Sequence, residues 1–287
     1  MVTRTRLLVC VSLALLLSVS TVRSSAQDAL TFTTIDVPGA TETDCNAINK
    51  FGAIVGTYFD STGASHGFIR SNGKFQFLNV PNASATLAYG INDSNQVVGW
   101  YTDQLGVTHG YMWNGHFNTI DYPLASTTNA WTITNAGTIV GAYVDANGTF
   151  HGFIDVQGAF SSVNVPNSIL TESTGLNNLG VMVGLFDDST GEERGFLRNS
   201  AGKYFQINYP GATVTAADRI NDSGEVVGLW GTSTSGPFHG YTRINGTFTS
   251  VDAPGATETR TRGLNNAGVI VGRYTDSAGV IHGYSAQ

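Results

Sequence analysis

Histidine is the residue type in this chain with the clearest capacity for metal chemistry, because an imidazole nitrogen is a common zinc ligand. The chain has 287 residues and 6 histidines. Five of them recur at one repeat position, each directly before Gly-Phe or Gly-Tyr: His66, His109, His151, His239 and His282. Arg194 takes the sixth place, and arginine is not a metal ligand. We therefore predict that these histidines are structural and that the chain uses no metal or other cofactor.

Aspartate recurs in a similar way, at the start of a turn. The residues are Asp60, Asp103, Asp145, Asp188 and Asp276, with Thr232 in the remaining unit. A calcium loop needs several alternating oxygen ligands, and these turns offer a single aspartate each. An aspartate at a turn accepts hydrogen bonds from the backbone that follows it. The pattern predicts turn capping.

These recurring residues belong to a repeat that covers the chain after its first 30 residues or so. Six prolines are spaced by 42 to 44 residues: Pro38, Pro81, Pro123, Pro166, Pro210 and Pro254. Each is followed five residues later by a threonine, from Thr43 to Thr259, and then by an aliphatic residue, from Ile48 to Leu264. Self-similarity at this period is typical of repeat architectures.

Each unit contains four short strand-like runs separated by turns. The first turn ends in glycine or asparagine, as positive φ requires: Gly52, Asn95, Gly137, Gly180, Gly224 and Gly268. The sixth unit stops after its third run at Gln287, and the missing fourth run stands at the beginning of the repeats, at residues 32–38. Complementary ends indicate a closed circle. The sequence predicts an all-β, six-bladed β-propeller with four strands per blade, closed by the N-terminal strand.

The recurring Gly-Ile-Asn-Asp-Ser-Gly-x-Val-Val-Gly segment, followed about ten residues later by His-Gly-Phe or His-Gly-Tyr, resembles the HAF-type extracellular repeat. The resemblance covers essentially the whole repeat region, with glycine where the family has alanine. It implies a secreted or cell-surface bacterial protein with a propeller fold. It implies no catalytic residues.

A site for one ligand is asymmetric, so we expect it among residues that vary while their surroundings repeat. The first strand of each unit carries such positions, which lie two and four residues before the repeated aliphatic residue. The candidates for ligand binding at the mouth of the central channel are Tyr89, Trp131, Glu172, Asp218, Arg219, Arg260 and Arg262. Aromatic rings beside mixed charge suit a sugar or another polar ligand. The alternative is that water fills the channel and its lining varies freely.

Three functions follow from these observations. The first is a non-enzymatic propeller that binds glycan or protein ligands, at the channel mouth or in equivalent pockets of the blades. The second is an extracellular hydrolase or lyase with Glu172 and Asp218 as a carboxylate pair and the three arginines orienting an acidic sugar. The third is a structural or matrix protein. No nucleophile motif is present, so we predict no catalytic residue.

The first 26 residues have the pattern of a secretory signal peptide. Arg4 and Arg6 precede 13 apolar residues, and Ser24 and Ala26 form a small-residue cleavage site. Thirteen apolar residues are fewer than the about 20 that span a bilayer. The sequence thus predicts cleavage near Ala26, release into a periplasmic or extracellular space, and one domain over residues 27–287.

The composition of the remaining chain limits the kinds of partner that the protein is expected to bind. Removing the three arginines of the leader from 14 basic residues leaves 11 against 21 acidic ones, a net charge of −10. Binding to nucleic acid or anionic lipid requires clustered Lys and Arg, so we expect no nucleic-acid partner and no membrane insertion. Only one cysteine remains, Cys45, which cannot form an internal disulfide. We expect a monomer.

Overall fold

The structure, a computed structural model, describes residues 30–287, and all of their regular secondary structure is β-strand. The predicted signal peptide, residues 1–26, lies outside the described residues. Thr31–Gln287 form one compact unit. Among residues 30–287 there is no helix of the length and hydropathy needed to cross a membrane.

Four sheets of four antiparallel strands follow the chain directly, each built from one stretch of sequence. The first is β6 (Ala85–Ile91), β7 (Val97–Thr102), β8 (Thr108–Trp113) and β9 (Phe117–Ile120). The second is β10 (Thr127–Ile133), β11 (Ile139–Val144), β12 (Phe150–Val156) and β13 (Ala159–Val163). The third is β14 (Leu170–Leu176), β15 (Met182–Asp187), β16 (Glu193–Arg198) and β17 (Tyr204–Ile207). The fourth is β18 (Val214–Ile220), β19 (Val226–Gly231), β20 (His239–Ile244) and β21 (Thr247–Val251).

The remaining eight strands form one larger sheet made of two four-stranded antiparallel groups. One group is β2 (Glu42–Ile48), β3 (Ile54–Phe59), β4 (Ser65–Ser71) and β5 (Lys74–Leu78). The other is β22 (Glu258–Leu264), β23 (Ile270–Thr275), β24 (Ile281–Ala286) and β1 (Phe32–Ile35). The two groups are joined by one parallel residue pair, Glu42 with Ile281.

The two ends of the described chain meet in this sheet, as the sequence predicts. β1 pairs antiparallel with β24 from Phe32–Ala286 to Ile35–Gly283. The Thr31 amide donates to the Gln287 carbonyl at 2.8 Å. The first described strand is therefore the outer strand of the sheet whose other three strands end the chain.

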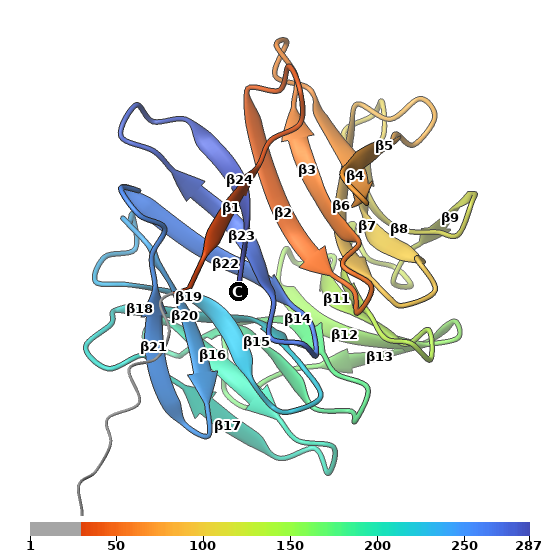
Figure 1. Cartoon of the computed structure of the whole chain (residues 1–287). Helices are drawn as coiled ribbons and strands as arrows, with labels where there is room; N and C mark the ends of the chain where they lie inside the picture. Colours follow the sequence, from red (N-terminus) through yellow and green to blue (C-terminus); the bar gives the residue numbers. More distant parts are fainter. Residues whose placement is uncertain (1–29) are drawn as a thin grey trace, which may run out of the picture. The chain divides into compact units, whose positions relative to one another are not determined.

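The four-stranded groups surround a common centre, and the first strand of each group lies innermost, next to the first strands of its neighbours (Figure 1). β2, β6, β10, β14, β18 and β22 contact one another in this order, and β22 contacts β2. Residues 31–287 thus form an all-β propeller of four-stranded groups, which confirms the predicted fold class and the predicted four strands per blade.

The repeated threonines explain how each outer strand is tied to the next inner strand. The Thr43 hydroxyl accepts a hydrogen bond at 3.1 Å from the Val37 amide, the residue before the repeated proline. The same bond, from a residue six positions earlier, is accepted by Thr86, Thr128, Thr171, Thr215 and Thr259. All six side chains are buried.

The glycine of the second strand is required by a close approach of the backbone. A Cβ atom on Gly56 would lie 2.0 Å from the Asp44 carbonyl oxygen and 2.6 Å from the Phe68 ring. Equivalent contacts surround Gly99, Gly141, Gly184, Gly228 and Gly272. Each third strand can therefore place a large aromatic side chain directly against the second strand, and this packing forms much of the core.

The repeated aspartates and histidines have the structural roles predicted for them. Asp60 Oδ1 accepts hydrogen bonds from the Thr62 and Ala64 amides, which caps the turn. His66 bonds Asn79 through Nδ1 at 2.7 Å and Asp60 through Nε2 at 3.1 Å, and its ring stacks on Tyr58. The other repeated histidines each bond a side chain that follows the outermost strand of their own group.

Candidate functional site

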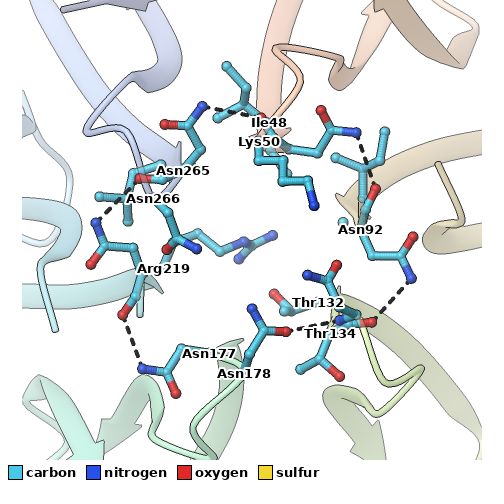
Figure 2. Close-up of a pocket in the computed structure, with 18 of the residues that line it drawn as sticks. Ile48, Lys50, Asn92, Thr132, Thr134, Asn177, Asn178, Arg219, Asn265 and Asn266 are labelled. Carbon is cyan, nitrogen blue, oxygen red and sulfur yellow. Dashed lines mark hydrogen bonds between the residues drawn. The ribbon is translucent and has the colours of Figure 1, made fainter. Parts of the chain in front are cut away.

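One mouth of the channel is surrounded by two sets of hydrogen bonds between neighbouring units, and Figure 2 shows the inner set around the opening. In the inner set, the Asn49 side-chain amide donates to the Asn92 carbonyl at 3.2 Å. The same bond runs from Asn92 to Thr134, Asn177 to Asn221, Asn221 to Asn265, and Asn265 to Asn49. Thr134 has no amide to donate, so this inner asparagine ring lacks one bond. These five asparagines hold neighbouring units in register.

The outer set uses the next residue of each turn. The Lys50 amide donates to Asp93 Oδ1 at 3.1 Å. The same bond runs from Asp93 to Asn135, Asn135 to Asn178, Asn178 to Asp222, and Asp222 to Asn266. Because these side chains already bond one another, this mouth offers few free groups to a ligand.

Arg219 occupies the middle of the channel and separates its two mouths. Its side chain points into the centre of the asparagine ring (Figure 2) and also lines the cavity at the opposite mouth. Nη1 donates to the carbonyls of Thr174 and Asp218 at 2.6 and 2.8 Å. Nη2 donates to those of Tyr89 and Trp131 at 2.8 and 2.9 Å. Both terminal nitrogens thus donate to backbone carbonyl groups, and Arg219 stabilises the wall of the channel.

A β-bulge in each innermost strand determines which side chains enter the channel. In β2 the register shifts between Cys45 and Ala47, which leaves Asn46 as the extra residue. The extra residue in the other inner strands is Tyr89, Trp131, Thr174, Asp218 and Arg262. A bulge bends the strand and redirects a side chain, and bulges are frequent beside active sites. The bulged position is thus one at which all six units carry a different residue.

The bulged residues meet at the mouth opposite the asparagine ring. A cavity of about 100 Å³ there is lined by six of the seven predicted residues: Tyr89, Trp131, Glu172, Asp218, Arg219 and Arg262. The seventh, Arg260, lines an adjoining pocket of about 330 Å³ between the β14–β17 and β18–β21 sheets. Leu185, Asp218 and Arg262 line both spaces, so the two form one continuous region, here called the mouth pocket.

Aromatic side chains form one wall of the mouth pocket. The Tyr89 and Trp131 rings meet edge to face with centroids 4.4 Å apart, and Trp100 stacks on Tyr89 at 6.2 Å. The indole N–H groups of Trp100 and Trp131 are buried and have no hydrogen-bond partner within residues 30–287. A wall of this kind offers ring faces and two free donors to a ligand.

The facing wall is charged and incompletely paired. Asp218 is 6% exposed, and its Oδ1 lies 3.8 Å from Arg262 Nη1, beyond hydrogen-bond distance. Asp218 Oδ2 and Arg262 Nε are buried and have no partner in the described part of the chain. Buried polar atoms are normally bonded, so these are free to accept and donate to a polar ligand.

Burial also changes the acidity of the carboxyl groups in this wall. Burial and the nearby Glu193 and Asp218 carboxylates raise the pKa of Glu172 to about 7. Burial and the charges of Asp187 and Asp218 raise the pKa of Glu193 to about 7 as well. The pKa of Asp218 is raised by its burial, against the opposing effect of Arg262 and Arg219. Three carboxyl groups of one pocket therefore hold their protons more tightly than carboxyl groups in water.

Sequence reasoning missed Asp187, Glu193 and Phe238 among the residues that line the mouth pocket, and it missed Trp100, which stacks on Tyr89. Trp100 directly faces Leu87 across the first two strands. Its repeat position, directly after the second-strand glycine, reads Thr57, Trp100, Ala142, Leu185, Leu229 and Arg273. That variation is visible in the sequence and marks the position as part of the site. Asp187, Glu193 and Phe238 lie at strand ends, where the repeat alone does not show that two sheets face each other.

Comparison with known proteins supports the fold at low sequence identity. No family model matches the chain, and no curated protein matches it either. Among solved structures, AofleA from Arthrobotrys oligospora is similar with a TM-score of 0.57 at 12% identity, over 89% of this chain and 86% of that one. The Aleuria aurantia lectin, described as a six-bladed propeller with a fucose recognition mode, has a TM-score of 0.53 at 9% identity, over 88% and 93%. A streptogramin B lyase has a TM-score of 0.53 at 11% identity, over 90% and 98%.

Proposed function

We propose that this protein is a secreted, non-enzymatic, six-bladed propeller that binds a glycan at the mouth pocket. This proposal rests mainly on one observation: the variable residues at the bulges of the six inner strands meet in the mouth pocket. The site combines an aromatic wall with unpartnered buried polar atoms. Sugars present both apolar C–H faces and many hydroxyl groups, so they match both walls.

Six blades follow from counting the two four-stranded groups of the larger sheet separately. They share a single parallel residue pair, whereas strands within a group pair along their length. The six sequence units and the six inner strands in contact around the channel support this count. So does the description of the Aleuria aurantia lectin as six-bladed.

Secretion is supported by the signal-peptide pattern and by the resemblance to HAF-type extracellular repeats. The test is expression of the full chain in a bacterial host, followed by sequencing of the N-terminus of the exported protein. We expect export and a mature N-terminus near Gln27. Retention in the cytoplasm with the leader intact would contradict this part of the proposal.

Glycan binding is tested on an array of neutral, acidic and amino sugars with the wild type and Trp131→Ala. The Trp131 ring is part of the aromatic wall, so its loss is expected to weaken binding by about tenfold or more. Phe205→Ala is the matched control, because Phe205 is a half-exposed aromatic residue on the outer strand β17. Absence of binding to any glycan, or equal binding by both variants, would overturn the proposal.

One observation favours a hydrolase or lyase as the second candidate. A carboxyl group with a pKa of about 7, such as Glu172, is suited to proton transfer near neutral pH. If the protein is an enzyme, glycan fragments will appear on incubation and Glu172→Gln will stop their release while binding persists. One of the similar structures, a streptogramin B lyase, has an enzymatic name.

A further inference from the structure

The mouth pocket contains a like-charged pair that the repeat does not have elsewhere. Asp187 on β15 and Glu193 on β16 lie directly opposite each other. The equivalent pairs are Phe59 with Ser65, Thr102 with Thr108, Val144 with Phe150, and Thr275 with Ile281. Like charges directly opposite in a sheet are destabilising. A destabilising pair at one repeat position, where the others are neutral, points to a function of that pair.

Glu172 belongs to the same cluster. It pairs with Leu185, which lies two residues before Asp187, so Glu172, Asp187 and Glu193 share one face of the β14–β17 sheet. That face meets β18, whose Asp218 and Ala216 line the same pocket. Within residues 30–287 the carboxylates of Glu172, Asp187 and Glu193 neither accept a hydrogen bond nor form an ion pair.

Within residues 30–287, the arginines of the mouth form no hydrogen bond or ion pair with these three carboxylates. Arg260 Nε donates to Glu258 at 2.7 Å, and Arg262 is the nearest cation to Asp218. Arg273 faces Asp44 at 3.7 Å, and Arg219 binds four backbone carbonyls. The three unpaired carboxylates therefore lack a cation of their own. The raised pKa of Glu172 and of Glu193 has the same origin, since burial and neighbouring carboxylates both favour the protonated forms.

The geometry favours an organic cation over a metal ion. Within the described residues, no group of three or more His, Cys, Asp or Glu side chains is placed to hold a metal. The pocket wall beside the carboxylates is apolar, with Leu185, Val214, Leu229 and Phe238. Such a wall suits the carbon skeleton of a ligand whose ammonium group reaches the carboxylates.

We propose that the ligand of the mouth pocket is an amino sugar with a free amine, held by Glu172, Asp187 and Glu193. This inference rests on the proposed glycan-binding function and adds the chemistry of the glycan. The pocket between the two sheets, at about 330 Å³, is at the small end of the roughly 300–1,000 Å³ typical of ligand sites. The 100 Å³ cavity beside Tyr89 and Trp131 adds room for part of a second sugar ring, so a short oligosaccharide fits both spaces.

The test is calorimetric titration of the full exported protein near neutral pH with three oligosaccharides of equal length. These are glucosamine, N-acetylglucosamine and galacturonate oligomers, which carry amines, neutral amides and carboxylates. We expect the glucosamine oligomer to bind at least about tenfold more tightly than the other two. We also expect Glu193→Gln and Asp187→Asn to remove most of this preference, because each deletes a charge while keeping the side-chain shape.

Glu225→Gln is the matched control, because Glu225 lies beside the asparagine ring at the other mouth and should leave all three affinities unchanged. Tighter or equal binding of the N-acetylated oligomer would overturn the inference and leave the proposed function standing. Preference for galacturonate would also overturn it and would assign the arginines to the ligand. Binding of polylysine without any of the sugars, or no binding at all, would overturn both the inference and the proposed function.

Discussion

Individual side chains of the mouth pocket oppose the stability of the fold. Glu172 and Glu193 are largely buried, and each has a pKa of about 7 against an ordinary value of 4.5. Because the folded state binds these protons more tightly than the unfolded chain, their contribution to stability is complete below about pH 4.5 and is lost as pH rises through 7. Residues arranged for binding often reduce stability in this way.

This argument predicts a pH-dependent difference between the wild type and the double variant Glu172→Gln, Glu193→Gln. We expect the free energy of unfolding of the wild type to fall relative to the variant between pH 5 and pH 8, by on the order of 3 kcal/mol. Titratable groups elsewhere, including His282 at the chain closure, are common to both proteins and cancel. Urea unfolding at several pH values measures the difference. Parallel stability curves would show that these carboxyl groups are not protonated in the folded state.

At the scale of strands and turns, the inner asparagine ring is a set of equivalent hydrogen bonds with one position unfilled. Thr134 already accepts the Thr138 amide through Oγ1, as an asparagine accepts at this position in the other units. An asparagine there would add the missing donor to the Asn177 carbonyl. The turn itself needs no change, since Gly137 has the same positive φ as its counterparts.

Thr134→Asn is therefore predicted to stabilise the protein. One added hydrogen bond contributes about 0.5–1.5 kcal/mol, which corresponds to a rise in Tm of roughly 2–4 °C in a domain of this size. Asn265→Ala, which removes the bond to Asn49, is expected to lower Tm by a similar amount or more. Differential scanning calorimetry distinguishes the two variants from the wild type. A lower Tm for Thr134→Asn would mean that the turn after β10 differs from the others in more than its side chain.

Most of the strands and turns were predictable because their signals are local and repeat six times. The positive φ of Gly52 and of its five counterparts was expected from residue type alone. The bulges were not, because a bulge adds one residue to a strand without any residue preference, and Asn46, Trp131 and Asp218 share no chemical property. Because every unit contains the same extra residue, a comparison of the units does not show that it is extra.

Within the site, the sequence predicted which residues gather but not how they bond. Six of the seven candidates line one cavity because four of them occupy the bulged position of their strands and the other two, Glu172 and Arg219, lie within two residues of a bulge. The bonding of Arg219 to four carbonyls depends on backbone from four different units and has no signature in its own segment. The Asp187–Glu193 pair lies in a groove between sheets, where the partners depend on distances across the fold.

At the scale of the whole propeller, the circle is held together by the pairing of chain ends. β1 and β24 pair over four residues, and His282 of β24 bonds Asp36 directly after β1 at 2.9 Å. Each four-stranded group is connected to the next along the chain, and β1 leads directly into β2, so the chain is interrupted only inside the group of β22, β23, β24 and β1. Three strands of this group come from one end of the chain and the fourth comes from the other end. The circle is therefore closed by the backbone hydrogen bonds of a complete sheet.

Two circular permutants of residues 31–287 test this role of the split unit. Both join Gln287 to Thr31 by a short Gly-Ser linker, which the 2.8 Å contact between these residues allows. The first begins at Ala159, so β13 becomes an N-terminal strand that pairs with β12 at the other end of the chain. The second begins at Ala125, after the exposed Leu124, so that it opens between units and no sheet contains both ends. We expect both to fold, because every strand keeps its neighbours.

We expect the permutant that begins at Ala159 to match the unpermuted chain in stability, and the permutant that begins at Ala125 to unfold at a lower urea concentration. In the second permutant the open junction is held by side-chain packing between β6–β9 and β10–β13 and by isolated hydrogen bonds, such as Asn92 to Thr134 and Tyr122 to Thr128. Local opening there exposes whole sheet faces without first breaking a strand pair. Hydrogen exchange should show the loss of protection in β9 and β10 of that permutant alone. Equal urea midpoints for the two permutants would mean that packing between units, and not the shared sheet, closes the propeller.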